Sequence, residues 1–139
     1  IKEAPIDRIW SSVSCSFCFK RSIIQQHNIR LSTNVKYSED REFIIKYLLH
    51  TNNIFESDNK PYFYRKNPTS AVNTKRSYDR CCDDFRVINN VLDFINQEQI
   101  QLSIKQKEIL SFFINLHLNI VLLLLLLELL ISHIQFHYF

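Results

Sequence analysis

Glu39, Asp40 and Glu42 are three acids at the start of a predicted helix, directly after Ser38. We expect Ser38 to cap this helix, because a serine hydroxyl can accept a hydrogen bond from a backbone N–H group of the first turn. The helix dipole favours ionised carboxylates at this end, and many such acids have no further role. Asp40 is nevertheless a candidate catalytic base, because a helix start holds a carboxylate in a fixed position.

Four cysteines and two C-terminal histidines have spacings that also occur in metal sites. One cysteine pair is separated by two residues, but the other pair is adjacent, and adjacent cysteines rarely bind one tetrahedral ion. We therefore expect buried, reduced thiols and no metal site. His133 and His137 lie four residues apart without an evident third ligand, so we predict surface histidines. The cysteines are Cys15, Cys18, Cys81 and Cys82.

The spacing of apolar residues predicts four helices and three short strands. The predicted helices are 20–27, 38–51, about 76–95 and the segment from 103 onward. The predicted strands are 13–19, 54–57 and 62–66. Residues 1–9 are expected to be irregular, with Pro5 as a breaker.

Two of these helices have a clear apolar face. In the helix over 38–51 it consists of Phe43, Ile44, Tyr47 and Leu48. In the helix over 76–95 it consists of Tyr78, Cys81, Phe85, Ile88, Leu92 and Ile95. We expect both faces to pack on a core, and the charged face of the second helix to be solvated. That charged face consists of Arg76, Asp79, Arg80, Asp83, Asp84 and Arg86.

The composition is that of a globular chain, with 139 residues, 46% hydrophobic and 22% charged. The net charge of +3 is modest, and the aromatic residues are not interleaved with basic ones, so we expect no nucleic-acid partner. The chain contains no glycine, which excludes a glycine-rich phosphate loop, a dinucleotide fingerprint and a nucleophile elbow. Since methionine is also absent, we expect the chain to be part of a larger protein.

Several segments, in this order, resemble the C-terminal half of family 2 glycosyltransferases, of the bacterial kind that builds capsular or other surface polysaccharides. The resemblance extends over about residues 8–95. The segments that carry it are Trp10, 19–24, Ile29, 38–43, 62–65 and Ser70.

The resemblance implies an α/β fold, namely the C-terminal part of a GT-A domain with a Rossmann-like sheet. This part should be mostly helical, with a few short strands and a long C-terminal helix. Residues 1–97 would form the acceptor-side part of the catalytic domain, without its donor-binding half. Residues 98–139 would form a helical extension.

The resemblance also assigns roles to individual residues. Asp40 matches the general base that takes a proton from the acceptor hydroxyl, and Glu39 and Trp10 would lie at the acceptor site. Arg65 would pair with a donor phosphate, although a solvated arginine at a sheet edge is an equal alternative. Sugar would pass with inversion from a nucleotide-sugar donor to a glycan or lipid-linked acceptor. The family's divalent ion, Mg²⁺ or Mn²⁺, is held by an Asp-x-Asp motif that this sequence lacks, so the chain alone should be inactive.

A second hypothesis is a non-catalytic helical interaction or membrane-surface module whose working part is 103–139. Its apolar run, 120–127, has polar residues on both sides, which favours a buried or surface-lying helix over a membrane span. Under either hypothesis we expect a cytoplasmic protein with peripheral contact at the inner face of the membrane.

Overall fold

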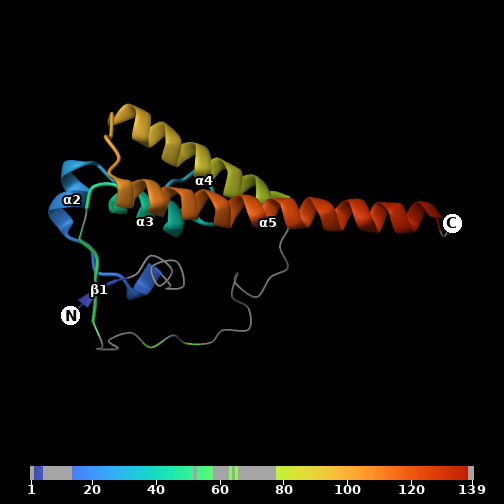
Figure 1. Ribbon diagram of the computed structural model, residues 1–139, viewed down its shortest axis with the longest axis horizontal. Coiled ribbons are helices and arrows are strands. Elements are labelled where there is room, and N and C mark those ends of the chain that lie inside the picture. Colours follow the sequence, from blue (N-terminus) through green and yellow to red (C-terminus); the bar gives the residue numbers. More distant parts are fainter. Residues whose placement is uncertain are drawn as a thin grey trace.

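The computed structural model describes residues 2–4, 14–51, 53–57, 63, 65 and 78–137, and in the last helix it describes side chains only up to Asn119 and that of Leu122. The chain is mostly helical in these ranges (Figure 1). The elements are β1 (Lys2–Glu3), η1 (Ser14–Ser16), α2 (Arg21–Gln26), α3 (Glu39–Leu48), β2 (Phe55–Glu56), α4 (Tyr78–Gln97) and α5 (Ile104–His137).

Helices α3, α4 and α5 contact one another and enclose the core. Val87 and Val91 of α4, Ile45 of α3 and Phe113 of α5 are all fully buried. Strands β1 and β2 form an antiparallel pair in which Lys2 lies opposite Glu56. Helix α5 is much longer than the others and extends past them toward the C-terminus (Figure 1).

The predicted helices are confirmed to within a few residues, but the strand predicted over 13–19 is wrong. Residues 14–16 form the 3₁₀ turn η1, and the following residues have no regular structure. Phe19 packs edge-on against Phe43 and Tyr47 of α3, with ring centroids 5.3 and 5.0 Å apart. Phe19 therefore contacts a helix instead of lying in a sheet.

The short strand predicted over 54–57 is present as β2, but its partner is β1, in a segment predicted to be irregular. Most of the strand predicted over 62–66 lies outside the described residues. The parallel sheet of a GT-A domain is not among the residues described, so the α/β assignment stays a prediction.

Helix α4 buries only part of the face predicted, since Ile88 is buried and Ile95 packs against the core, but other members of that face do not. Asp83 and Asp84, expected in solvent, are only 4% and 3% exposed, whereas Tyr78 at the start of the expected core face is 72% exposed. Phe85 and Leu92 are also exposed, while Val87 and Val91 are fully buried. The helix buries its two aspartates because residues 36–38 supply hydrogen-bond donors to both.

Two helices end in a left-handed residue that is not glycine. After α2, the backbone N–H of Ile29 donates to the carbonyl of Ile24, and Asn28 between them has φ 45°. After α4, the N–H of Ile100 donates to the carbonyl of Ile95, and Gln99 has φ 51°. Both are Schellman motifs, in which glycine is the usual left-handed residue. A chain without glycine must use asparagine and glutamine here.

Gln99→Gly is expected to stabilise the protein by up to about 1 kcal/mol. A glutamine in the left-handed conformation destabilises the folded chain by roughly 1–2 kcal/mol, and glycine removes this strain. Part of the gain is lost again, because glycine has more conformational freedom in the unfolded chain. Chemical denaturation measures the difference. The control is Gln101→Gly, an exposed neighbour without a positive φ, which should be slightly destabilising. Equal effects of the two substitutions would contradict the prediction.

Helix α5 begins with a capping box. The backbone N–H of Gln106 donates to Ser103 Oγ, and the N–H of Ser103 donates to Gln106 Oε1 at 2.9 Å. Gln106 is buried and its Nε2 donates to the carbonyl of Leu49 at 2.8 Å. One side chain therefore caps α5 and ties it to the end of α3.

Candidate functional site

Helix α3 starts at Glu39, close to the predicted start, but Ser38 does not cap it through its hydroxyl. Ser38 has a left-handed backbone with φ 64°, and its Oγ donates to Asp84 Oδ1 at 2.8 Å. The cap prediction is therefore wrong in its side-chain contact. The hydrogen bond from Ser38 to Asp84 instead attaches the start of α3 directly to α4.

Asp40 lies in the first turn of α3 and is half-buried. Its Oδ1 accepts a hydrogen bond from the backbone N–H of Arg41 at 2.8 Å. Residues three and seven positions apart share a helical face, so Asp40 is on the same side of α3 as Phe43 and Tyr47. That side faces the segment that begins with η1, because Phe19 packs against both rings. Tyr47 also accepts a hydrogen bond from the Lys20 backbone N–H at 2.9 Å.

The predicted core face of α3 is confirmed. Ile44, Tyr47 and Leu48 are buried, and Phe43 is partly buried against the core. The helix that holds Glu39 and Asp40 is therefore anchored by apolar contacts along its length.

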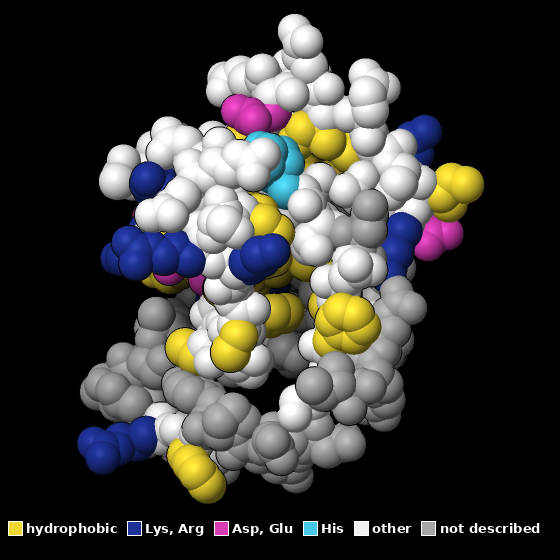
Figure 2. Space-filling view, turned by 90° about the vertical axis from the view of Figure 1, so that its left-hand side faces the viewer, with side chains coloured by type: hydrophobic (Ala, Val, Ile, Leu, Met, Phe, Trp, Pro, Cys, Tyr) yellow, Lys and Arg dark blue, Asp and Glu magenta, His cyan; other side chains and the backbone are white. Residues whose placement is uncertain are grey.

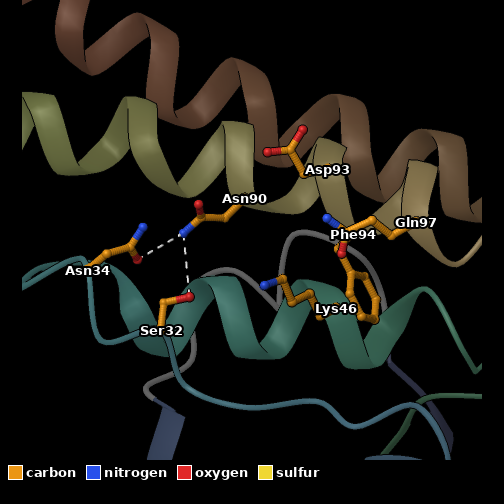
Figure 3. A pocket seen from close by; sticks show the side chains of 7 residues that line it. All are labelled: Ser32, Asn34, Lys46, Asn90, Asp93, Phe94 and Gln97. Carbon is orange, nitrogen blue, oxygen red and sulfur yellow. Dashed lines mark hydrogen bonds between the residues drawn. The ribbon is translucent and has the colours of Figure 1, made fainter.

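Glu42, the third acid of the helix start, is 1% exposed and belongs to a polar network. One carboxylate oxygen, Oε1, accepts hydrogen bonds from Lys46 Nζ and Ser32 Oγ, and Oε2 accepts from Asn90 Nδ2 at 3.0 Å. Asn90 also donates to Ser32 and Asn34, as Figure 3 shows. The network joins α3, α4 and the residues before α3. Sequence reasoning missed it, although Glu42 and Lys46 have the spacing of a helical ion pair.

A polar pocket of about 240 Å³ lies beside this network, between α4 and the segment before α3 (Figure 3). Amide, ammonium and carboxylate groups around one aromatic ring can bind a small polar ligand. Glu39 and Asp40 are not among its lining residues. The pocket is lined by Ser32, Asn34, Lys46, Asn90, Asp93, Phe94 and Gln97.

The two buried aspartates of α4 each bind the segment that leads into α3. Asp83 Oδ2 accepts from the backbone N–H groups of Lys36 at 2.8 Å and Tyr37 at 3.2 Å, and its Oδ1 accepts from Arg86 at 2.7 Å. Asp84 Oδ1 lies 3.7 Å from Nε2 of the buried His117 of α5. The entry to α3 is therefore fixed by carboxylates.

Burial raises the pKa of Asp83, but the hydrogen bonds from Lys36, Arg86 and Tyr37 outweigh it and lower the pKa below the ordinary value of 3.8. Between this lowered pKa and 3.8, Asp83 therefore binds a proton more readily in the unfolded chain than in the folded chain. Stability from Asp83 should thus be complete above about pH 3.8 and decline as the pH falls through the lowered pKa. Unfolding measured from pH 5 to 2 should show a weaker decline for Asp83→Asn than for the control Asp93→Asn. Parallel curves would contradict the assignment.

The structure describes the other predicted site residues only in part. Trp10 lies outside the described residues, and Arg65 is exposed. The side chains of His133 and His137 also lie outside the described residues. Cys15 and Cys18 are exposed, so the prediction of buried thiols is wrong for this pair. Cys15 lies within η1 and Cys18 shortly after it, whereas Phe17 and Phe19 pack against the core.

Asp83 and Asp84 do not fit the metal that the resemblance implies for the complete enzyme. Asp83 and Asp84 are buried, and their oxygens accept hydrogen bonds from Lys36, Tyr37 and Ser38. Another set of potential ligands does occur in the described part of the chain. It consists of His27, His50 and Glu98.

Within the part of the chain that the structure describes, none of the helices combines the length and the apolarity that crossing a membrane requires. Comparisons of the chain with protein-family models, with curated proteins and with solved structures found no match.

Proposed function

We propose that this chain is the acceptor-side part of an inverting glycosyltransferase, with Asp40 as the general base. The observation that carries the proposal is the placement of Asp40 in the first turn of a well-anchored helix, α3. The donor would be a nucleotide sugar bound by chain outside this sequence. The acceptor would be the hydroxyl of a glycan or lipid-linked sugar.

In the proposed step, the acceptor oxygen forms a bond to the anomeric carbon while the bond from that carbon to the diphosphate breaks. The hydroxyl proton passes to the Asp40 carboxylate, and a nucleoside diphosphate leaves. A base must lie about 2.6–3.2 Å from the hydroxyl oxygen, so its position must be fixed. The half-buried setting of Asp40 and the hydrogen bond from Arg41 to its Oδ1 support this role, since one carboxylate oxygen is oriented by the backbone.

The rigidity of the helix start also supports the proposal. Ser38 is hydrogen-bonded to Asp84, and Glu42 is hydrogen-bonded to Asn90, so the chain is attached to α4 two residues before and two residues after Asp40. Glu39, next to Asp40 and half-buried, would shape the acceptor site. A catalytic side chain is more effective when the surrounding residues hold it in the productive geometry.

The test is transfer of labelled sugar by the complete protein carrying Asp40→Asn, with folding checked separately. The isolated chain should turn over no nucleotide sugar, because it would lack the donor-binding half. Turnover by the isolated chain would overturn the assignment to the acceptor side.

A second candidate function, an interaction or membrane-surface module, is favoured by exposed apolar side chains on α4 and α5. Tyr78, Phe85 and Leu92 recur every seven residues on α4, and Leu118 and Leu122 lie one turn apart on α5. An apolar helical face can rest on the headgroup region of a bilayer, here at the inner face of the membrane.

Leu118→Ser/Leu122→Ser is expected to reduce co-sedimentation of the chain with anionic lipid vesicles, because exposed apolar area drives interfacial binding. The control, Ser111→Ala, changes an exposed residue of the same helix without removing apolar area. Unchanged sedimentation of the double variant would count against this second function.

A further inference from the structure

Three helices end at the same place, and each end contributes a side chain that can bind a metal ion. His27 directly follows α2, His50 comes two residues after α3, and Glu98 directly follows α4. One ligand atom from each lies within 4.8 Å of the others. In the space-filling view, histidine and acidic surfaces adjoin on the face that carries the α2 end of the molecule (Figure 2).

One distance in the cluster matches that of a tetrahedral site. His27 Nδ1 and Glu98 Oε2 are 3.4 Å apart. Bonds of 2.0–2.2 Å to Zn²⁺ place two ligands of a tetrahedron roughly 3.3–3.5 Å from each other. The His27 and His50 rings are stacked, with centroids 3.5 Å apart and planes at 13°. Imidazole nitrogens bind a metal in the plane of their ring, so a shared ion requires the half-buried His27 to turn out of this stack and the exposed Glu98 to turn toward the ion.

The electrostatic setting favours a cation. The C-terminal end of a helix carries a partial negative charge, and three such ends meet here. The nearest cation on α3, Lys46, is already paired with Glu42 and lies over the Phe94 ring.

His50 also has an unexplained polar atom. Its Nε2 is buried and has no hydrogen-bond partner among the described residues. Such atoms are rare in folded proteins and call for an explanation, of which an ion is one. Phe94 packs edge-on against the ring at 5.6 Å and holds its plane.

We propose that His27, His50 and Glu98 bind one zinc-class divalent cation that links the C-terminal ends of α2, α3 and α4. Two imidazoles and one carboxylate are a common protein ligand set for Zn²⁺, with water as the fourth ligand. The site lies at the opposite end of α3 from Asp40, so it is independent of the proposed transferase chemistry.

The test is calorimetric titration of ZnCl₂ into the chain carrying Cys15→Ser/Cys18→Ser, which removes the two exposed thiols as competing ligands. We expect one ion per chain. His27→Gln and Glu98→Gln should each weaken binding at least about 10-fold. Loss of a residue that only supports a metal ligand already weakens binding by about 10- to 100-fold, and loss of a ligand itself should cost no less. Zn²⁺ should raise the melting temperature of the parent chain and not that of either variant. Co²⁺ should give the visible spectrum of a tetrahedral site.

Two controls separate this site from other ligands. Glu108→Gln changes an exposed acid of α5 and should leave binding unchanged. His133→Gln/His137→Gln removes the other closely spaced histidines and should also leave it unchanged. Absence of binding, binding that survives both His27→Gln and Glu98→Gln in the folded chain, or binding lost with His133 and His137 would each overturn the proposal.

Discussion

Asp40→Asn is expected to lower the rate of sugar transfer by the complete protein about 10²- to 10⁴-fold, the usual contribution of a general base. Asparagine keeps the shape of the side chain and can still accept the hydrogen bond from Arg41. It cannot take up the proton of the acceptor hydroxyl. The loss should therefore appear in the turnover rate, measured with saturating donor and acceptor.

The controls for Asp40 are neighbouring acids with different roles. Asp79→Asn changes an exposed acid in the first turn of α4 and should leave transfer unchanged. Glu39→Gln should act mainly on the KM for the acceptor, since this residue is assigned to shape its site. Circular dichroism should show that Asp40→Asn folds, because one acid at a helix start contributes at most about 1 kcal/mol. Full activity of folded Asp40→Asn would leave the chain with a structural role only.

Glu42→Leu is expected to lower the free energy of unfolding by about 3–5 kcal/mol, the usual effect of breaking a buried ion pair. The substitution leaves Lys46, Ser32 and Asn90 without the carboxylate that accepts from all three. Lys46 is held near the interior, with its side chain 12% exposed. Denaturant titration of the chain measures the loss.

A double variant tests the mechanism of this loss. Glu42→Leu/Lys46→Leu removes both charges and should be more stable than Glu42→Leu, because no unpaired ammonium remains. Glu108→Leu, an exposed site on α5, should change stability by about 0.5 kcal/mol or less. If Glu42→Leu resembled Glu108→Leu, the carboxylate would be exposed to water in solution.

The sequence was a good guide to the helices and a poor one to their orientation. The apolar spacing correctly predicted α3, with Ile44, Tyr47 and Leu48 inside, and a last helix that begins at about Ser103. It was only partly right for α4, where Ile88 is buried as predicted but valines and aspartates also face the core. A periodicity argument counts each aspartate as solvated, whereas here backbone N–H groups of residues 36 and 37 replace the water around Asp83.

In the candidate site, too, local features could be predicted from the sequence, whereas contacts between distant segments could not. Asp40 could be placed at the start of a helix from its sequence context, because that prediction depends on neighbouring residues only. The meeting of His27, His50 and Glu98 could not, since it depends on the relative placement of three helix ends. The bond from Ser38 to Asp84 was equally hidden, because serine before an acidic helix start suggests a local cap.

The buried carboxylates of α4 have a consequence for how the helices are aligned. Sliding α4 by one turn would separate Asp83 from Lys36 and Tyr37, and Asp84 from Ser38. Asp83 would keep its ion pair with Arg86 of the same helix, but both buried carboxylates would lose their hydrogen bonds from residues 36–38, at a cost of about 1–3 kcal/mol or more each. Apolar side chains alone tolerate such a slip far better, since one methyl group can replace another. The hydrogen bonds to Asp83 and Asp84 can form at one alignment of the helices only, and they therefore set the register between α3 and α4.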